Sequence, residues 1–113
     1  MLKAIKQQVE YILSVSEDAR NSDYFLTKAL WAKYYKGYLL EVEGKLTLPL
    51  DYYEEVANPN DITRARRHIQ NPKPDKGYKG KYLPSSLEVR KRRKIREEDY
   101  RRWLGYNPEL REV

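Results

Sequence analysis

The sequence has no cysteine, a single histidine and only five glycines among its 113 residues. Without cysteine, a disulfide scaffold, a thiol nucleophile and every cysteine-based metal site are excluded. With a single histidine, the usual zinc sites are nearly excluded as well, because they need several nitrogen or sulfur ligands. We therefore expect a protein that uses neither a metal nor another cofactor.

Long apolar runs are also missing from the chain. None approaches the roughly 20 residues that span a bilayer. Residues 1–6 lack the apolar stretch and small-residue cleavage site of a signal peptide. Hydrophobic residues still make up 40% of the sequence, which is enough for one small core. These features predict a soluble, cytoplasmic, single-domain protein with no membrane contact.

Charge is distributed unevenly along the chain. Residues 1–61 hold 7 Lys/Arg against 10 Asp/Glu, whereas residues 62–104 hold 15 against 5. The net charge of the first segment is therefore −3 and that of the second is +10. A segment so basic repels itself, and it is typical of proteins that bind a polyanion such as nucleic acid. The plain alternative is a charged face that only keeps the protein in solution.

Apolar spacing predicts two helices in the first third of the chain. Leu, Ile and Val recur three and four residues apart over residues 2–14. Residues 21–23 (Asn-Ser-Asp) are typical of a helix N-cap, so a second helix is expected over about 23–35. The aromatic residues on and after it are interpreted as core, with a base-stacking platform as the alternative; they are Phe25, Trp31, Tyr34, Tyr35 and Tyr38.

The middle of the chain carries weaker signals. Residues 39–48 alternate partly in polarity around a glycine, which favours a short hairpin or a connecting loop. Asp51 is a candidate N-cap for a short helix, with Glu54 completing a variant of the capping box. That helix is expected to end by Asn58, because Pro59 disfavours helical backbone in the residue before it.

A basic helix is then predicted over residues 62–70. Asn58 and Pro59 are a typical helix start, and Ile62, Ala65 and Ile69 are spaced to face inward. The outer faces are left with polar residues that are candidates for contact with DNA bases: Asn60, Thr63, Arg64, Arg67, His68 and Asn71. The alternative for Arg64, Arg66 and Arg67 is a solvated face that pairs with nearby acids.

Two further basic segments follow this helix. Residues 76–84 alternate Lys, Gly and Tyr between prolines, which predicts a β-hairpin or an extended loop carrying the candidate DNA contacts Lys76, Tyr78, Lys79 and Lys81. Ser85 with Glu88 is a capping box for a last helix over 86–104, ended by Gly105. Its first turns carry Arg90, Lys91, Arg93 and Lys94. Near its end, Trp103, Leu104 and Tyr106 are candidates for core or for homodimer contact.

The order of these elements matches a winged helix-turn-helix: short helix, tight turn, basic helix, basic hairpin. The sequence thus predicts a mainly α fold, with a short β-hairpin wing and a basic C-terminal helix, as one domain over residues 1–105 and a tail at 106–113. Such a protein binds double-stranded DNA, with the basic helix in the major groove and the wing and last helix on phosphates. No enzyme is expected, because the sequence contains no phosphate-binding glycine loop and no nucleophile elbow.

Several strings resemble a group of small phage and prophage proteins: Arg20-Asn21-Ser22-Asp23, Trp31, and residues 62–70, 80–84 and 89–93. The resemblance spans most of the chain, although residues 34–50 and 72–76 depart from it. Members of that group are described at most as DNA-binding proteins. The resemblance implies a viral protein in the host-cell cytoplasm. It leaves open a phage-encoded inhibitor or adaptor that binds a host or CRISPR-type nucleoprotein complex through aromatic residues around Trp31 and Tyr35.

Overall fold

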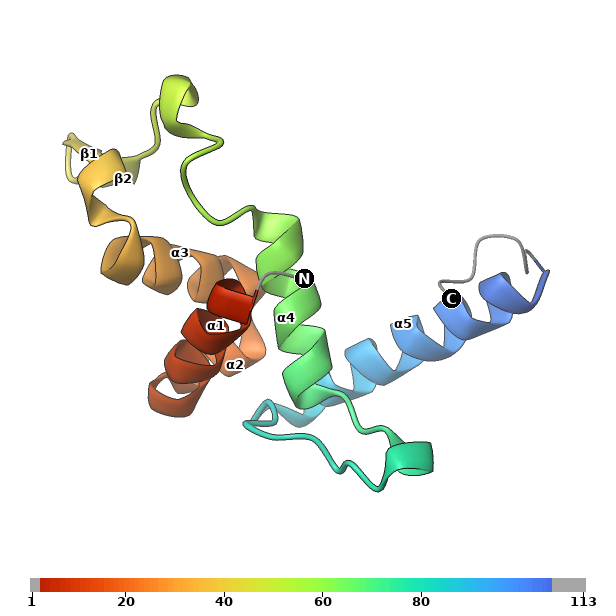
Figure 1. The fold of residues 1–113 in the computed structure, drawn as a ribbon. Helices are drawn as coiled ribbons and strands as arrows, with labels where there is room; N and C mark the ends of the chain where they lie inside the picture. The colour runs from red at the N-terminus through yellow and green to blue at the C-terminus, as the bar shows by residue number, and fades with distance from the viewer. Residues whose placement is uncertain (1–2, 107–113) are drawn as a thin grey trace. The chain divides into compact units, whose positions relative to one another are not determined.

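The structure is a computed structural model that describes residues 3–106 (Figure 1). The side chains of residues 3, 97, 100, 101 and 103–106 lie outside the description, so the candidates Trp103, Leu104 and Tyr106 are not placed by it, nor is the tail at 107–113. The chain divides into two compact units, Met1–Leu83 and Pro84–Val113. Helices dominate both units, so the mainly α class is confirmed.

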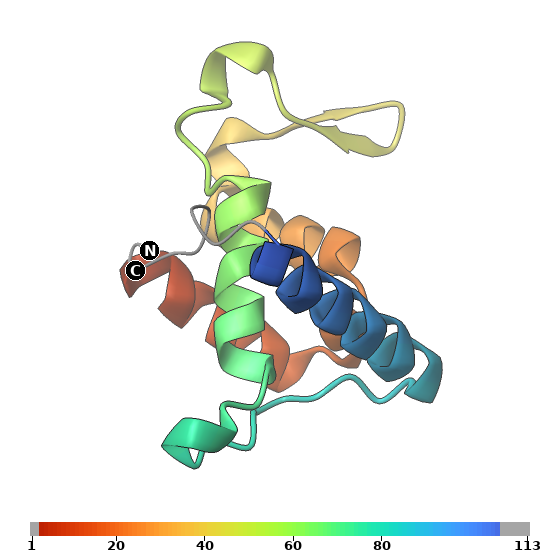
Figure 2. The same cartoon turned by 90° about the vertical axis from the view of Figure 1, so that its right-hand side faces the viewer.

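Three helices form the core of the first unit: α1 (Lys3–Val15), α3 (Asp23–Tyr34) and α4 (Pro59–Gln70). Each packs against the other two, and Figure 2 shows them crossing one another. The side chains buried between them are mostly aliphatic and include Val9, Leu13, Leu26, Leu30 and Ile62. The three predicted helices are therefore present, with bounds that differ from the expectation by a few residues.

The start of α4 is set by the signals that predicted it. The Asn58 side chain accepts a hydrogen bond from the Asn60 amide at 2.8 Å, and Pro59 is the first helical residue. Proline suits this position because its missing N–H would have no partner in the helix anyway. Ile62, Ala65 and Ile69 are buried, as their spacing predicted.

A short helix, α2 (Glu17–Asn21), joins α1 to α3 and was not predicted from the sequence. Ser16 caps it by accepting a hydrogen bond from the Ala19 amide at 3.2 Å. Five residues are too few to show a helical period, so apolar spacing could not reveal this helix. The Ser22 hydroxyl caps the next helix, α3, in the same way.

A β-hairpin occupies part of the long connection between α3 and α4. Strand β1 (Leu40–Val42) pairs antiparallel with β2 (Lys45–Thr47), and Glu43 and Gly44 form the turn with φ of 51° and 76°. Two successive positive φ values are typical of the type I′ turn of a two-residue hairpin. Every residue of both strands is exposed. The hairpin expected as one option for residues 39–48 is confirmed.

The short α-helix expected over residues 51–58 is not formed. A 3₁₀ helix, η2 (Leu50–Tyr52), is followed by turns, and Asp51 does not act as a cap. Residues 50–55 are all exposed, and only Val56 and Ala57 at the end of the segment are buried. Two adjacent buried residues do not make the apolar face that would stabilise a helix against its entropy cost. The helices that pack against α4 are instead α1 and α3, and the tight helix-turn-helix predicted over 51–70 is wrong in this detail.

The β-hairpin wing expected over residues 76–84 is also not formed. Residues 73–82, here called the basic loop, contain a 3₁₀ turn, η3 (Pro74–Lys76), and a single β-bridge between Lys73 and Tyr78. The expected strands do not pair, because the Lys81 amide and the Tyr78 hydroxyl bond instead to the Ile69 carbonyl at the end of α4. The alternative of an extended loop is therefore the correct one. The ladder between β1 and β2 is the only one in the part of the chain that the structure describes.

The basic loop returns along the end of α4 through Gly80. The Lys81 amide donates to the Ile69 carbonyl at 2.9 Å, and the Tyr78 hydroxyl donates to the same carbonyl. Gly80 has φ of 86°, and a Cβ atom there would lie 2.2 Å from the Gln70 carbonyl oxygen. Only glycine therefore allows this close approach.

We expect Gly80→Ala to destabilise the protein by about 1–3 kcal/mol, because the methyl group meets a backbone oxygen and the backbone is left-handed. Urea unfolding followed by circular dichroism measures this change. Gly37→Ala is the matched control: a Cβ at Gly37 meets nothing within 4 Å, so its effect should stay within about 0.5 kcal/mol. Equal midpoints for the two variants would contradict the tight packing of the loop.

The aromatic residues on α3 and just after it divide between core and surface. Trp31 and Tyr35 pack against the core, as expected. Phe25 is 48% exposed, and Tyr34 and Tyr38 are also exposed, so the interpretation as core is wrong for these three. The inner face of α3 is already filled by Leu26 and Leu30, which leaves these larger rings outside.

The second unit contains one helix, α5 (Leu87–Tyr106). Ser86, and not Ser85, lies at its cap position and accepts a hydrogen bond from the Val89 amide at 3.3 Å. The predicted capping box is thus shifted by one residue, and Glu88 does not occupy its third helical position. The helix also continues past Gly105. In the described part of the chain, no helix is both long and apolar enough to cross a membrane.

Candidate nucleic-acid interface

One face of α4 presents a row of polar side chains to solvent. Asn60, Arg64, Arg67 and Asn71 follow one another at intervals of four, three and four residues, so they lie along one side of the helix. We call these four residues the α4 stripe. The first three are exposed, and Asn71, at the C-cap, is half-buried. The stripe lies opposite the face that carries Ile62 and Ile69, because those residues are buried in the core.

The chemistry of the α4 stripe matches that of DNA base edges. Arginine donates two hydrogen bonds to the O6 and N7 acceptors of guanine, and asparagine pairs in the same bidentate way with adenine. An α-helix also fits the width of the major groove. The structure therefore brings together four of the six α4 residues that the sequence predicted as base contacts.

Thr63 and His68 lie on opposite sides of the α4 stripe. Thr63 is half-buried and lines a groove beside α3, whereas His68 is exposed and lines a depression beside α1. The Nδ1 atom of His68 is 3.3 Å from the Lys73 ammonium nitrogen. These two residues therefore lie at the edges of the stripe rather than in it.

Arg66 is not part of any exposed face. Only 4% of the residue is accessible, and its Nε donates to an Asp23 carboxylate oxygen at 2.6 Å. A second guanidinium nitrogen lies 3.4 Å from the other Asp23 oxygen, and a third donates to the Gln70 side chain at 3.2 Å. The interpretation of Arg66 as a solvated residue is corrected: it ties α4 to the start of α3.

Gln70 extends this buried network, and no role was predicted for it from the sequence. Its side-chain nitrogen donates to the Tyr82 carbonyl at 2.7 Å and lies 3.3 Å from the Arg20 carbonyl. One residue therefore joins α4 to the end of α2 and to the basic loop. The only available signal was the i, i+4 spacing from Arg66, which places both residues on one side of the helix.

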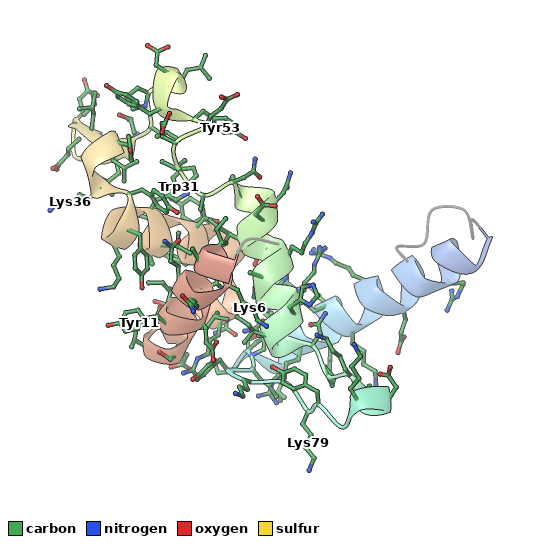
Figure 3. The ribbon with its side chains drawn as sticks, in the orientation of Figure 1. Lys6, Tyr11, Trp31, Lys36, Tyr53 and Lys79 are labelled. Carbon is green, nitrogen blue, oxygen red and sulfur yellow. The ribbon has the colours of Figure 1, made fainter. Side chains whose placement is uncertain are left out.

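The basic loop presents its lysines next to the end of α4. Lys76, Lys79 and Lys81 are exposed, and Figure 3 shows Lys79 pointing away from the helices. Tyr78 differs from them because its hydroxyl is bonded to the Ile69 carbonyl and its ring is half-buried. Tyr78 thus holds the loop in place within the chain.

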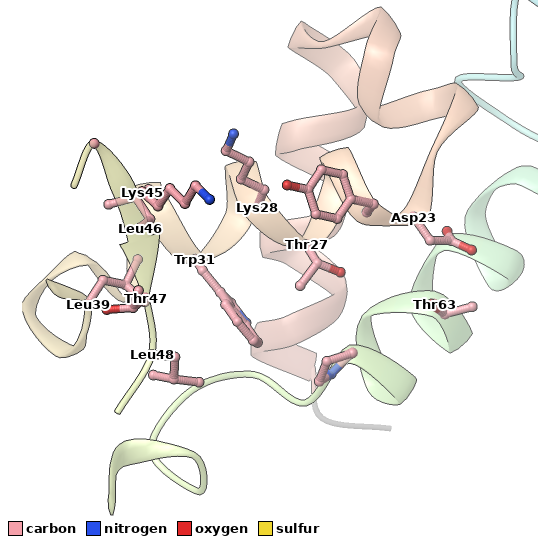
Figure 4. Close-up of a pocket in the computed structure, with 13 residues that line it drawn as sticks. Asp23, Thr27, Lys28, Trp31, Leu39, Lys45, Leu46, Thr47, Leu48 and Thr63 are labelled. Atoms are coloured by element: carbon pink, nitrogen blue, oxygen red, sulfur yellow. The ribbon is translucent and has the colours of Figure 1, made fainter. Parts of the chain in front are cut away.

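An apolar groove of about 1000 Å³ opens between α3, the hairpin and the start of α4 (Figure 4). Trp31 forms part of its wall, and the indole nitrogen is fixed by donation to the Ala57 carbonyl at 2.8 Å. Leu46 and Leu48 line it from the hairpin side, and Lys28 and Lys45 add two cations. This groove was not predictable from the sequence, because it is built from three separate segments.

No family model, curated protein or solved structure matches this chain. The site is therefore interpreted from its own chemistry. Among the side chains that the structure describes, no group of three or more carboxylates and histidines comes together as a metal site would require.

The remaining predicted contacts lie on α5, in the second unit. Arg90, Lys91 and Lys94 are exposed, and Arg93 is half-buried. Arg90, Arg93 and Lys94 are three and four residues apart, so they share one face of the helix. The Arg90 Nε also donates to the Pro84 carbonyl, which lies just before the helix. The arrangement suits contact with phosphates, since it needs charge rather than an exact pattern of donors.

Proposed function

We propose that this protein binds double-stranded DNA without catalysis, with the α4 stripe in the major groove. The observation that carries the proposal is the alignment of Asn60, Arg64, Arg67 and Asn71 on one solvent-facing side of the helix. Arg66, the one α4 arginine off this face, is neutralised by Asp23. The arginines that remain available on α4 are thus concentrated where a base-reading helix carries them.

The mode of binding resembles that of a winged helix, with a loop in place of the β-hairpin wing. The basic loop is held against the end of α4 by its bonds to the Ile69 carbonyl, so its lysines move with the recognition helix. Lysine side chains beside a helix in the major groove meet the phosphates that border it. We further propose that α5 adds contacts to phosphates that do not depend on sequence.

Fluorescence anisotropy with random duplex DNA, titrated across salt concentrations, tests this proposal. Binding whose affinity falls by several powers of ten per tenfold rise in salt supports it, because each neutralised phosphate releases condensed counterions. An absence of binding at low salt would overturn it. That result would favour the second candidate function, an adaptor or inhibitor of a nucleoprotein complex, which the apolar groove beside Trp31 supports.

Replacing Arg90, Lys91, Arg93 and Lys94 by glutamine should flatten the salt dependence of DNA binding. The slope of log affinity against log salt should fall by about 0.9 for each phosphate that is no longer neutralised. Affinity should fall alike for random and selected DNA, because phosphates carry no sequence information. The variant Lys28→Gln/Lys33→Gln/Lys36→Gln/Lys45→Gln also removes four charges, from α3, η1 (Lys36–Tyr38) and β2, and it controls for net charge. An unchanged slope would contradict the proposal that α5 contacts phosphates.

A further inference from the structure

A depression of about 310 Å³ lies where α1, the end of α4 and the basic loop meet. Its walls carry Lys6 from α1, His68 from α4, and Lys73, Lys76 and Lys81 from the loop. We call this depression the lysine cup. One water takes up about 30 Å³, so the cup has room for a tetrahedral anion with several waters. Lys6 lies outside the basic segment 62–104, and nothing in the sequence pointed to it.

The positive charge of the lysine cup is largely uncompensated. Among the described residues that line it, Glu10 is the single carboxylate. Within the described part of the chain, no carboxylate forms an ion pair with any of the four lysines. Four lysines around one small volume repel one another. An anion bound among them removes that cost, so the arrangement favours a negatively charged ligand.

The cations of the cup are held in position by backbone contacts. Lys73 is bridged to Tyr78 by two backbone hydrogen bonds of 2.7 and 3.0 Å, and its ammonium lies 5.6 Å from the centre of the Tyr78 ring. Lys81 is fixed by its amide bond to the Ile69 carbonyl. Positions set in advance lower the entropy lost when a ligand binds. The backbone that carries the loop lysines is therefore fixed against the end of α4, and the Lys73 ammonium is also held beside the Tyr78 ring.

We infer that the lysine cup binds one phosphate group, and that Lys6 of α1 is part of that site. The inference rests on the proposed function and deepens it. His68 follows Arg67 directly in α4, so the cup borders the stripe that would enter the major groove. A phosphate of the DNA backbone at the edge of that groove fits this position. Lysine binds phosphate as a point charge and does not require the planar geometry of an arginine contact.

The test compares Lys6→Gln with Lys36→Gln by anisotropy on duplex DNA across salt. Lys36 lies on η1, away from α4 (Figure 3). We expect Lys6→Gln to lower the salt slope by about 0.9, the value for a single phosphate, and Lys36→Gln to leave it unchanged. Duplexes with 5′-phosphate and 5′-hydroxyl ends should bind equally if the phosphate is an internal one. Preference for the 5′-phosphate would assign the cup to a chain end.

A second measurement separates this inference from the proposed function. Inorganic phosphate is titrated into the full chain, and the amide resonances of Tyr78 and Lys81 are followed by NMR. We expect both to shift in the wild type and much less in Lys6→Gln. If Lys6→Gln matches Lys36→Gln in both assays while DNA still binds through Arg64 and Arg67, the cup is wrong and the proposed function stands. Phosphate shifts in a protein that binds no DNA would instead support the cup and overturn the proposed function.

Discussion

The double variant Arg64→Ala/Arg67→Ala is expected to lose about 2–4 kcal/mol of binding free energy on a selected DNA site, or roughly 30- to 1000-fold in affinity. Both side chains lie at the centre of the α4 stripe and are exposed, and the proposed function gives each of them a bidentate contact to guanine. Loss on random DNA should be much smaller, since base contacts carry the specificity. Anisotropy on a site selected from a random library and on unrelated duplex measures both values.

The control for charge is Lys33→Ala/Lys36→Ala, which also removes two positive charges, here from α3 and η1. It should weaken binding to both DNAs slightly and equally. Folding is not at risk in the test variant, because both arginines project from the outer side of the helix and alanine favours helix. Equal losses on selected and random DNA for Arg64→Ala/Arg67→Ala would refute the assignment of α4 as the base-reading helix.

Removing the partner of the buried arginine should produce the largest loss of stability. Asp23→Ala leaves the Arg66 guanidinium, whose side chain is only 5% exposed, without its carboxylate. We expect the free energy of unfolding to fall by about 2–4 kcal/mol. The loss is somewhat below that for a fully buried pair, because the Asp23 side chain is 40% exposed. Against a total stability of roughly 5–15 kcal/mol for a domain, this loss is large. Urea unfolding measures it.

Two further variants identify the cause of that loss. Asp51→Ala, in the exposed turn η2, removes a carboxylate without stranding a buried charge and should stay within about 0.5 kcal/mol. Asp23→Ala/Arg66→Met removes both members of the pair, and it should recover most of the stability, because an apolar side chain tolerates the buried site. If the double variant is no more stable than Asp23→Ala, the loss comes from the start of α3 and not from Arg66.

The α4 stripe and the buried network are interleaved on one helix. Arg64 and Arg67 face solvent, and Arg66 between them is buried with Gln70. The ion pair with Asp23 therefore holds α4 against α3 while the neighbouring arginines stay available. Variants of Arg66 should lower the stability of the fold, and they should change DNA affinity only as a consequence of that loss of stability.

The local signals of helix formation were readable in advance. Asn58 and Pro59 start α4 as predicted, and the inward spacing of Ile62, Ala65 and Ile69 is confirmed. These features depend on residues a few positions apart, so no long-range contact has to be known. The β1–β2 hairpin belongs to the same class, since a glycine turn and flanking alternation are local.

The predictions that were wrong depend on tertiary contacts between residues that are distant in sequence. A capping pattern at Asp51 was not enough for a helix, because residues 50–55 are exposed and only Val56 and Ala57 after them reach the core. The segment from 76 to 84 did not become a hairpin, because its residues bond to the end of α4 instead. Local propensity is a weak prior, and tertiary contacts override it in short segments.

By itself, the sequence determined the helical class, the three core helices and the outer face that carries Arg64 and Arg67, because periodicity alone decides which side of a helix is apolar. Only the tertiary structure decided that Arg66 is buried while its neighbours are not, since that depends on Asp23, which is distant in sequence. The same is true of the lysine cup. Lys6 lies beside the loop lysines because α1 packs on α4. The local sequence patterns of α1 and of the basic loop do not predict that packing.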